Sequence, residues 1–198
     1  MKKIFAKALL FTAALSLAGC QDFLEEKNIA SQSAEAFYAT AAGYESLMTG
    51  AYNTLKSVYN STTYYSLAQL GTDISTQNNG NTTNALNQYT PDYLNDNGTV
   101  SGYWNTLYAA LKNVNAVIGR AGNVITKDQD PRDGMDKAVV AQHVAEAKFL
   151  RALYLFEIVK NWGQAPLLLE EPTSASTTSK LNSGKEFYTQ ILADLKDV

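Results

Sequence analysis

The chain has 198 residues, of which 45% are hydrophobic and 18% charged, so it holds enough apolar material for one folded domain or two. Its 16 Lys and Arg against 19 Asp and Glu leave no basic surface to neutralise a phosphate backbone, so nucleic acid is not an expected partner. The single Cys excludes an intramolecular disulfide and a Cys-based zinc site, and the single His excludes most His-based metal sites. We therefore expect neither a metal nor another cofactor.

The N-terminal segment has the organisation of a secretory signal. Three lysines precede an apolar run over 8–18, which at about 1.5 Å per residue is too short to cross a hydrocarbon layer about 30 Å thick. The run ends in Leu17-Ala18-Gly19-Cys20, which resembles a bacterial lipobox. We predict a lipoprotein signal peptide over 1–19 and acylation of Cys20, whose acyl chains would hold the protein on a membrane. The alternative is a chance cysteine behind an ordinary signal peptide.

Residues 20–32 are polar and are expected to link the lipid anchor to a main domain over 33–198. Ser33 is a plausible N-cap for one long amphipathic helix, because apolar residues then recur three and four positions apart. They are Phe37, Ala41, Tyr44, Met48, Ala51, Leu55 and Val58.

Residues 61–107 differ from the rest, with eight Asn, five Tyr and no Lys or Arg. We expect this segment to be mostly irregular up to a second helix that carries Trp104 to Ile118 and ends near Gly119–Gly122. So long an irregular stretch is either a functional loop or a surface insertion, and both interpretations remain open.

A third helix is predicted from an Asp130 cap, with Pro131 at its first position, to Trp162, where Gly163 ends it. Residues 167–169 then predict a short buried extended segment. Ser183 and Glu186 form a capping box for a fourth helix. That helix is still periodic at Val198, which predicts that the sequence is part of a longer protein. Helical pairs joined by loops favour an all-α, tetratricopeptide-like solenoid with long irregular loops.

Little of the sequence suggests catalysis. His143 is the only histidine that could serve as a base for a nucleophile, and its place on a helix favours a structural role. Glu146 and Glu157 are separated by about 16 Å of helix, too far for a glycosidase pair. The acidic residues between Asp128 and Asp136 do not follow a calcium-loop pattern and are expected to cap the third helix.

The Asn- and Tyr-rich segment has the composition of a neutral-carbohydrate site. Amides and carboxylates bind hydroxyl pairs, and aromatic rings stack on sugar C–H faces. We therefore expect the ligand face to include Asn78, Asn79, Tyr89 and Tyr93, with Asp73 holding the loop. Asn residues that satisfy turns and Tyr rings that pack on the scaffold are an equal alternative.

One stretch resembles a known family. Residues 145–152, AEAKFLRA, followed by Trp162-Gly163 and Pro166-Leu167, resemble the signature helix of the SusD/RagB family of outer-membrane nutrient-binding lipoproteins. Further matches along the chain are Asp22-Phe23-Leu24 after Cys20, Gly50-Ala51-Tyr52-Asn53, Thr72-Asp73, Trp104, Tyr108 and Asn115. The resemblance covers essentially the whole chain, which corresponds to the N-terminal part of longer family members.

The resemblance implies a lipid anchor in the outer membrane with the body facing the cell exterior, and partnership with a SusC-like TonB-dependent transporter. It implies capture of oligosaccharides without enzymatic activity. A peptide-binding RagB-like protein and a non-binding tetratricopeptide-type scaffold remain alternatives. In starch-binding members an aromatic ring follows the Thr-Asp pair, but here residues 74–80 contain none.

The resemblance also implies structural roles for the signature helix. Ala145, Ala147 and Ala152 would allow close helix approach, and Phe149 and Leu150 would fill the core. Glu146 and Arg151 would cap or pair with neighbours rather than touch a ligand.

Overall fold

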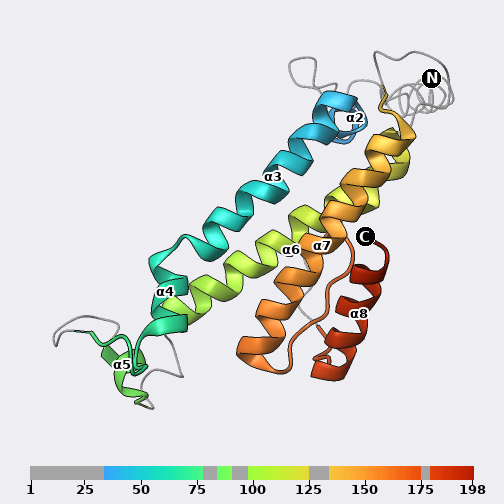
Figure 1. Cartoon of the computed structure of the whole chain (residues 1–198). Coiled ribbons are helices and arrows are strands. Elements are labelled where there is room, and N and C mark those ends of the chain that lie inside the picture. Colours follow the sequence, from blue (N-terminus) through green and yellow to red (C-terminus); the bar gives the residue numbers. More distant parts are fainter. Residues whose placement is uncertain (1–33, 78–83, 91–97, 125–133, 175–178) are drawn as a thin grey trace, which may run out of the picture. The chain divides into compact units, whose positions relative to one another are not determined.

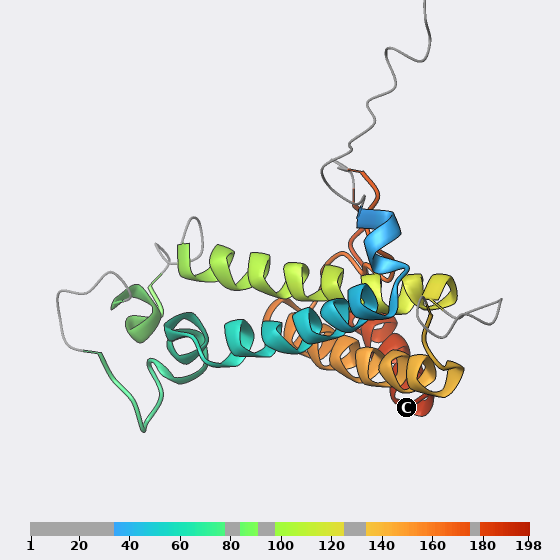
Figure 2. The same ribbon diagram turned by 90° about the horizontal axis from the view of Figure 1, so that it is seen from above.

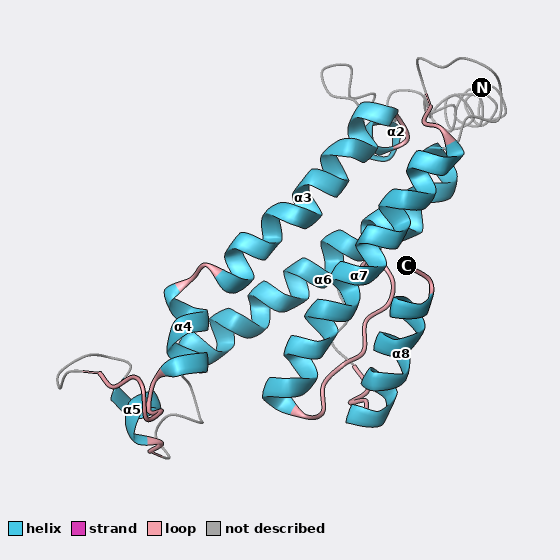
Figure 3. Cartoon of the chain, viewed as in Figure 1, coloured by secondary structure: helices cyan, strands magenta, loops and turns pink. Residues whose placement is uncertain are grey.

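The computed structural model describes residues 34–77, 84–90, 98–124, 134–174 and 179–198. Cys20 and the linker over 20–32 lie outside these ranges, in a separate unit, Met1–Ser33, while everything described belongs to the unit Ala34–Val198. The helices, in chain order, are α2 (Ala34–Tyr38), α3 (Ala41–Tyr59), α4 (Thr62–Gln69), α5 (Asn84–Gln88), α6 (Gly98–Val124), α7 (Lys137–Trp162) and α8 (Gly184–Lys196). Within the described ranges the chain is helix and loop, which confirms the all-α prediction (Figure 3).

The four long helices form an antiparallel array in chain order. α3 packs on α6, α6 on α7 and α7 on α8 (Figures 1 and 2). One apolar core joins all four, because each helix directs a stripe of residues inward. Its fully buried members include Tyr44, Leu107, Leu111, Tyr154, Ile158 and Phe187. This arrangement confirms the predicted helical-pair scaffold.

The single first helix predicted from Ser33 is wrong, since the chain breaks between α2 and α3. Thr40 is extended, and its hydroxyl accepts a hydrogen bond from the Gly43 amide at 3.1 Å. A Cβ on Gly43 would lie 1.9 Å from the Phe37 carbonyl oxygen, so α2 can fold back on α3 only because this position is glycine. The N-cap of the long helix is therefore Thr40.

The expectation that 61–107 is mostly irregular is also wrong in part. Ser61 caps α4 by accepting from the Tyr64 amide at 3.1 Å, a short α5 follows, and α6 already begins at Gly98. α6 continues to Val124, two residues past the predicted end at Gly119–Gly122, and Val124 is 1% exposed. Packing of this end against the core outweighs the low helix propensity of its glycines.

In the C-terminal half of the chain, one predicted helix boundary is wrong and two are confirmed. α7 begins at Lys137 behind Asp136, whose carboxylate accepts from the Ala138 amide at 2.7 Å, and not behind Asp130, which lies outside the described residues. Gly163 ends α7 at φ 71°, as predicted. The capping box at Ser183 is present as predicted, and α8 ends at Lys196 with Asp197 as its C-cap.

None of the helices in the described ranges combines the length and the apolar composition that a membrane span requires.

Candidate functional site

The described part of the Asn- and Tyr-rich segment forms a hydrogen-bonded turn beyond α4. Thr72 and Ser75 form an isolated antiparallel β-bridge, and the Thr72 hydroxyl donates to the Gln69 carbonyl at 2.8 Å. The Tyr65 hydroxyl and Ser75 Oγ lie 2.7 Å apart, which ties the turn to the helix. The turn therefore has a defined position at the end of the array.

Tyr89 rests on this turn although it is 18 residues away in sequence. Its hydroxyl donates to the Gly71 carbonyl at 3.2 Å, and a Cβ on Gly71 would lie 2.8 Å from the Tyr89 ring. Gly71 has φ 76°, and glycine is thus the only residue type that fits beneath the ring. Tyr89 itself has φ 51°, a strained value for a side chain of this size, and it remains 72% exposed.

The structure brings some of the predicted site residues together and leaves others undescribed. Tyr89 lies beside the turn that holds Asp73, whose side chain is exposed and has no hydrogen bond to a described residue. Asn87, which sequence reasoning missed, instead holds the loop by accepting from the Gln77 amide at 3.0 Å. Asn78, Asn79 and Tyr93 lie outside the described residues.

The exposed surface of this loop is mostly apolar or neutral, and the Asp73 carboxylate is the charged group among its described residues. Besides Tyr89, the side chains of Ile74 and Tyr65 are 79% and 51% exposed. Tyr65 was also missed as a candidate, although it belongs to the same Tyr-rich segment. Exposed tyrosines offer a ring face for stacking and a hydroxyl for hydrogen bonding. We define the loop site as Tyr65, Gly71–Gln77 and Tyr89.

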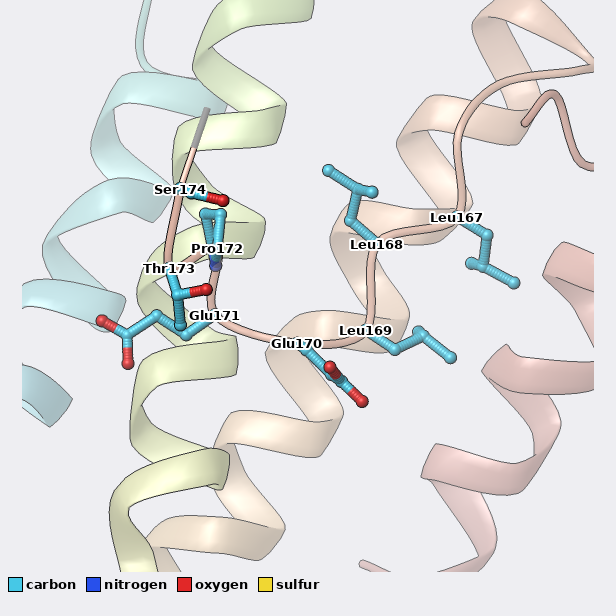
Figure 4. A pocket seen from close by; sticks show the side chains of 8 residues that line it. All are labelled: Leu167, Leu168, Leu169, Glu170, Glu171, Pro172, Thr173 and Ser174. Carbon is cyan, nitrogen blue, oxygen red and sulfur yellow. The ribbon is translucent and has the colours of Figure 1, made fainter. Parts of the chain in front are cut away.

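A second surface is the segment between α7 and α8. It curves around a hollow of about 480 Å³ lined by residues 167–174. The chain turns at Glu170, so that Leu168 and Ser174 stand on opposite arms (Figure 4). Leu168 is 40% exposed, so the prediction of a buried extended segment over 167–169 is wrong at this position. The lining holds two carboxylates, of which Glu171 is paired with Arg120, and the hydroxyls of Thr173 and Ser174, but no aromatic ring.

Side chains from the array fix this segment. Tyr108 donates to the Pro166 carbonyl at 2.7 Å, and the Asn115 amide donates to the Leu168 and Glu170 carbonyls at 3.1 and 3.3 Å. Arg151 reaches the Leu169 carbonyl at 3.2 Å and the Asn115 side-chain oxygen at 3.2 Å.

The same Arg151 makes a bidentate ion pair with Asp194 of α8. Its Nε donates to Asp194 Oδ2 at 2.8 Å, and its Nη2 donates to Oδ1 at 2.6 Å. Arg151 is 6% exposed and Asp194 2%. Such planar, bidentate geometry is what arginine forms with a carboxylate in a desolvated place. The pairing role expected of Arg151 is confirmed.

Glu157, one of the two carboxylates considered for catalysis, lies in a buried cluster. It is 4% exposed and accepts from Tyr59 of α3 and Tyr103 of α6, both at 3.2 Å, while Lys160 lies 2.5 Å away. Burial and the adjacent carboxylate raise the pKa of both tyrosines far above the ordinary value. Glu157 therefore joins three helices.

The other residues considered for chemistry are also engaged in contacts. Glu146 accepts from Tyr52 at 3.0 Å, and the ring nitrogen Nε2 of His143 lies 3.0 Å from a Glu45 oxygen. Asp136 is used as a helix cap. Phe149 is 50% exposed, so the prediction that it fills the core is wrong, because its side of α7 faces away from α6.

An antiparallel array of helices that fixes a tyrosine-bearing loop without Lys or Arg at its end defines a helical binding scaffold. A family model described as "starch-binding associating with outer membrane" matches residues 22–198. The chain therefore belongs to the SusD-like family.

Individual relatives agree with this family. SusD-like protein P25 of Formosa agariphila is 30% identical over 165 residues, which cover 76% of this chain and 29% of that protein. A SusD superfamily protein from Bacteroides vulgatus has a crystal structure similar to this fold, with TM-score 0.66 and 24% identity over 81% of this chain and 34% of that one. Surface glycan-binding protein A from Bacteroides fluxus has TM-score 0.55 and 26% identity, over 80% and 32%. The chain spans about a third of the length of these proteins.

Proposed function

We propose that the protein is a cell-surface lipoprotein that binds a neutral oligosaccharide and delivers it to a SusC-like TonB-dependent transporter of the outer membrane. Family membership, whose description names starch binding and the outer membrane, supports the class of ligand and the location. The likeness to a protein named for surface glycan binding supports the same class.

The observation that carries the proposal is the position of Tyr89. Residues 74–80 contain no aromatic ring, yet folding places the Tyr89 ring directly on Gly71, beside the Thr72-Asp73 pair. Gly71 supports the ring while most of it stays accessible, which is the arrangement a sugar C–H face needs for stacking.

The polar groups around the ring suit an uncharged ligand. Residues 61–107 contain no Lys or Arg, so no cation favours an anionic ligand there. Asp73 is exposed beside the ring and can accept hydrogen bonds from a pair of sugar hydroxyls. Binding without cleavage is supported by the contacts of Glu146, Glu157 and His143, each of which is paired with another part of the scaffold.

The test is calorimetric titration of the full-length protein with a panel of starch fragments and other neutral oligosaccharides. Tyr89→Ala should raise the Kd by about 5- to 30-fold, because one stacked ring contributes about 1–2 kcal/mol. Tyr52→Ala is the matched control, since Tyr52 is also exposed but belongs to α3. The control should leave the Kd unchanged, and both variants should keep the melting temperature.

Four results would contradict the proposal or part of it. Release of reducing ends from the panel would identify an enzyme. Binding of peptides and no glycan would favour the peptide-binding alternative, and binding of neither would favour a scaffold. A Tyr89→Ala protein with unchanged affinity would remove the loop site from the proposal.

A further inference from the structure

Two consecutive tyrosines of α4 are used in different ways. The Tyr64 ring packs on the rings of Tyr59 and Tyr103, at centroid distances of 5.1 and 6.0 Å. The Tyr65 ring packs on no aromatic ring of the described chain and is 51% exposed. Consecutive side chains leave a helix about 100° apart, so only one of the two can face the core. Tyr64 therefore belongs to the scaffold, and the Tyr65 ring stays accessible.

The hydroxyl of Tyr65 is nevertheless fixed, since it lies 2.7 Å from Ser75 Oγ, ten residues away. Tyr89 follows the same pattern. Its hydroxyl donates to the Gly71 carbonyl at 3.2 Å, while its ring contacts no aromatic ring among the described residues and is 72% exposed. In both tyrosines the polar end is bonded to the turn and the ring is left for another partner.

A single turn holds both tyrosines, which reach it from α4 and from the end of α5 (Figure 1). Thr72 and Ser75 form the β-bridge, in which paired Cα atoms are about 4.5–5.5 Å apart, and two residues connect them. Tyr89 is attached next to Thr72, and Tyr65 is attached to Ser75. The two hydroxyls are therefore bound on opposite sides of one bridge, and each ring keeps its own face because the rings do not stack on each other.

We propose that Tyr65 is a second stacking ring of the loop site, that Ser75 positions it, and that the site selects a ligand with at least two linked sugar rings. This inference rests on the function proposed above. A ring whose hydroxyl is hydrogen-bonded has fewer orientations to lose when a ligand binds. Because both rings are attached to the same turn, a chain that stacks on one meets the other at a high effective concentration.

The two residues between the attachment points suit such a chain. The Asp73 side chain is exposed and can accept hydrogen bonds from sugar hydroxyls, and Ile74 is 79% exposed and offers an apolar contact to sugar C–H groups. A single sugar ring can stack on only one tyrosine. Chain length is therefore the property of the ligand that the loop site distinguishes.

The test is calorimetric titration of the full-length protein with chains of increasing length. Three series are used: glucose to maltoheptaose, cellobiose to cellohexaose and xylobiose to xylohexaose. In the series that binds, the Kd should fall by about tenfold or more from the shortest member to the first chain that reaches both rings, and change little beyond it. Tyr65→Ala should raise the Kd of long chains about 5- to 30-fold and remove most of this dependence on length.

The role of Ser75 has its own readout. Ser75→Ala should raise the Kd of long chains about 2- to 10-fold, because the Tyr65 hydroxyl loses its partner, and Ser75→Thr, which keeps a hydroxyl, should restore the wild-type value. Tyr52→Ala is the matched control, since the Tyr52 hydroxyl is also hydrogen-bonded, to Glu146, but on α3. This control should keep both the Kd and its dependence on length.

Three results would overturn the inference. If Tyr65→Ala keeps the wild-type dependence on chain length while Tyr89→Ala weakens binding, the second ring is excluded and the proposed function stands. Failure of all three series to bind at any length would overturn both. Equal losses in Ser75→Ala and Ser75→Thr would exclude the positioning role of the Ser75 hydroxyl.

Discussion

Arg151 illustrates how one residue of the family signature acts through several contacts. Its guanidinium pairs with Asp194 on α8 and reaches Asn115 on α6 and the Leu169 carbonyl. Arg151, Asp194 and Asn115 are all buried, which makes an unpaired partner among them costly. Arg151 therefore fixes both α8 and the start of the hollow over 167–174.

We predict that Arg151→Ala destabilises the protein by about 3–5 kcal/mol, because Asp194 would be left as a buried, unpaired carboxylate. Urea unfolding of the full-length protein measures this. The double variant Arg151→Met, Asp194→Leu removes both charges and should recover much of the loss. A single variant within about 0.5 kcal/mol of wild type would contradict this role.

At the scale of the elements, the caps decide where each helix begins. Thr40, Ser61, Asp136 and Ser183 each accept a hydrogen bond from an amide in the first turn of the following helix. Ser183 is the most completely paired, since its own amide also donates to the Glu186 carboxylate at 2.7 Å. The start of α8 is thus specified by residues within one turn, which explains why it could be predicted from the sequence.

This capping box predicts a pH dependence. The Ser183 amide, followed by Lys180, Ser183 Oγ and Asn182, lowers the pKa of Glu186 from 4.5 to about 2. Because the native carboxyl binds its proton less readily than the unfolded one, its contribution to stability is complete above about pH 4.5 and is lost as the pH falls towards 2. Urea midpoints between pH 7 and pH 3 should therefore fall less in Glu186→Gln than in wild type. Parallel pH profiles of the two proteins would refute this assignment.

At the scale of the whole molecule, the helical array and the predicted anchor have separate roles. The array over Ala34–Val198 holds the loop site, while the predicted anchor, Cys20, belongs to the preceding unit. A multiply acylated cysteine binds a bilayer stably, because each buried CH₂ contributes about 0.8 kcal/mol.

We predict that Cys20→Ala moves the protein from the membrane fraction to the supernatant, as judged by fractionation and immunoblotting of cells that express the full-length gene. Ser31→Ala, which leaves the lipobox intact, is the control and should stay with the membrane. Retention of the Cys20→Ala protein in the membrane at the wild-type level would exclude the anchor.

The sequence by itself determined what depends on local or periodic signals. The apolar stripes of α3, α6 and α7, the left-handed Gly163 and the capping box at Ser183 each involve residues a few positions apart, so their meaning is legible along the chain. The signature over 145–152 likewise predicted the family.

Only the tertiary structure decided the contacts between distant segments. Phe149 is half-exposed beside Ile191 and Leu195 of α8 and does not lie in the core. Gly43 lets α2 fold back on α3, because any Cβ there would meet the Phe37 carbonyl oxygen. α7 begins behind Asp136 and not behind Asp130. The pairing of Tyr89 with Gly71 belongs to the same class. These contacts depend on which surfaces pack together in the folded protein. Hydrophobic periodicity and capping preference do not specify that packing.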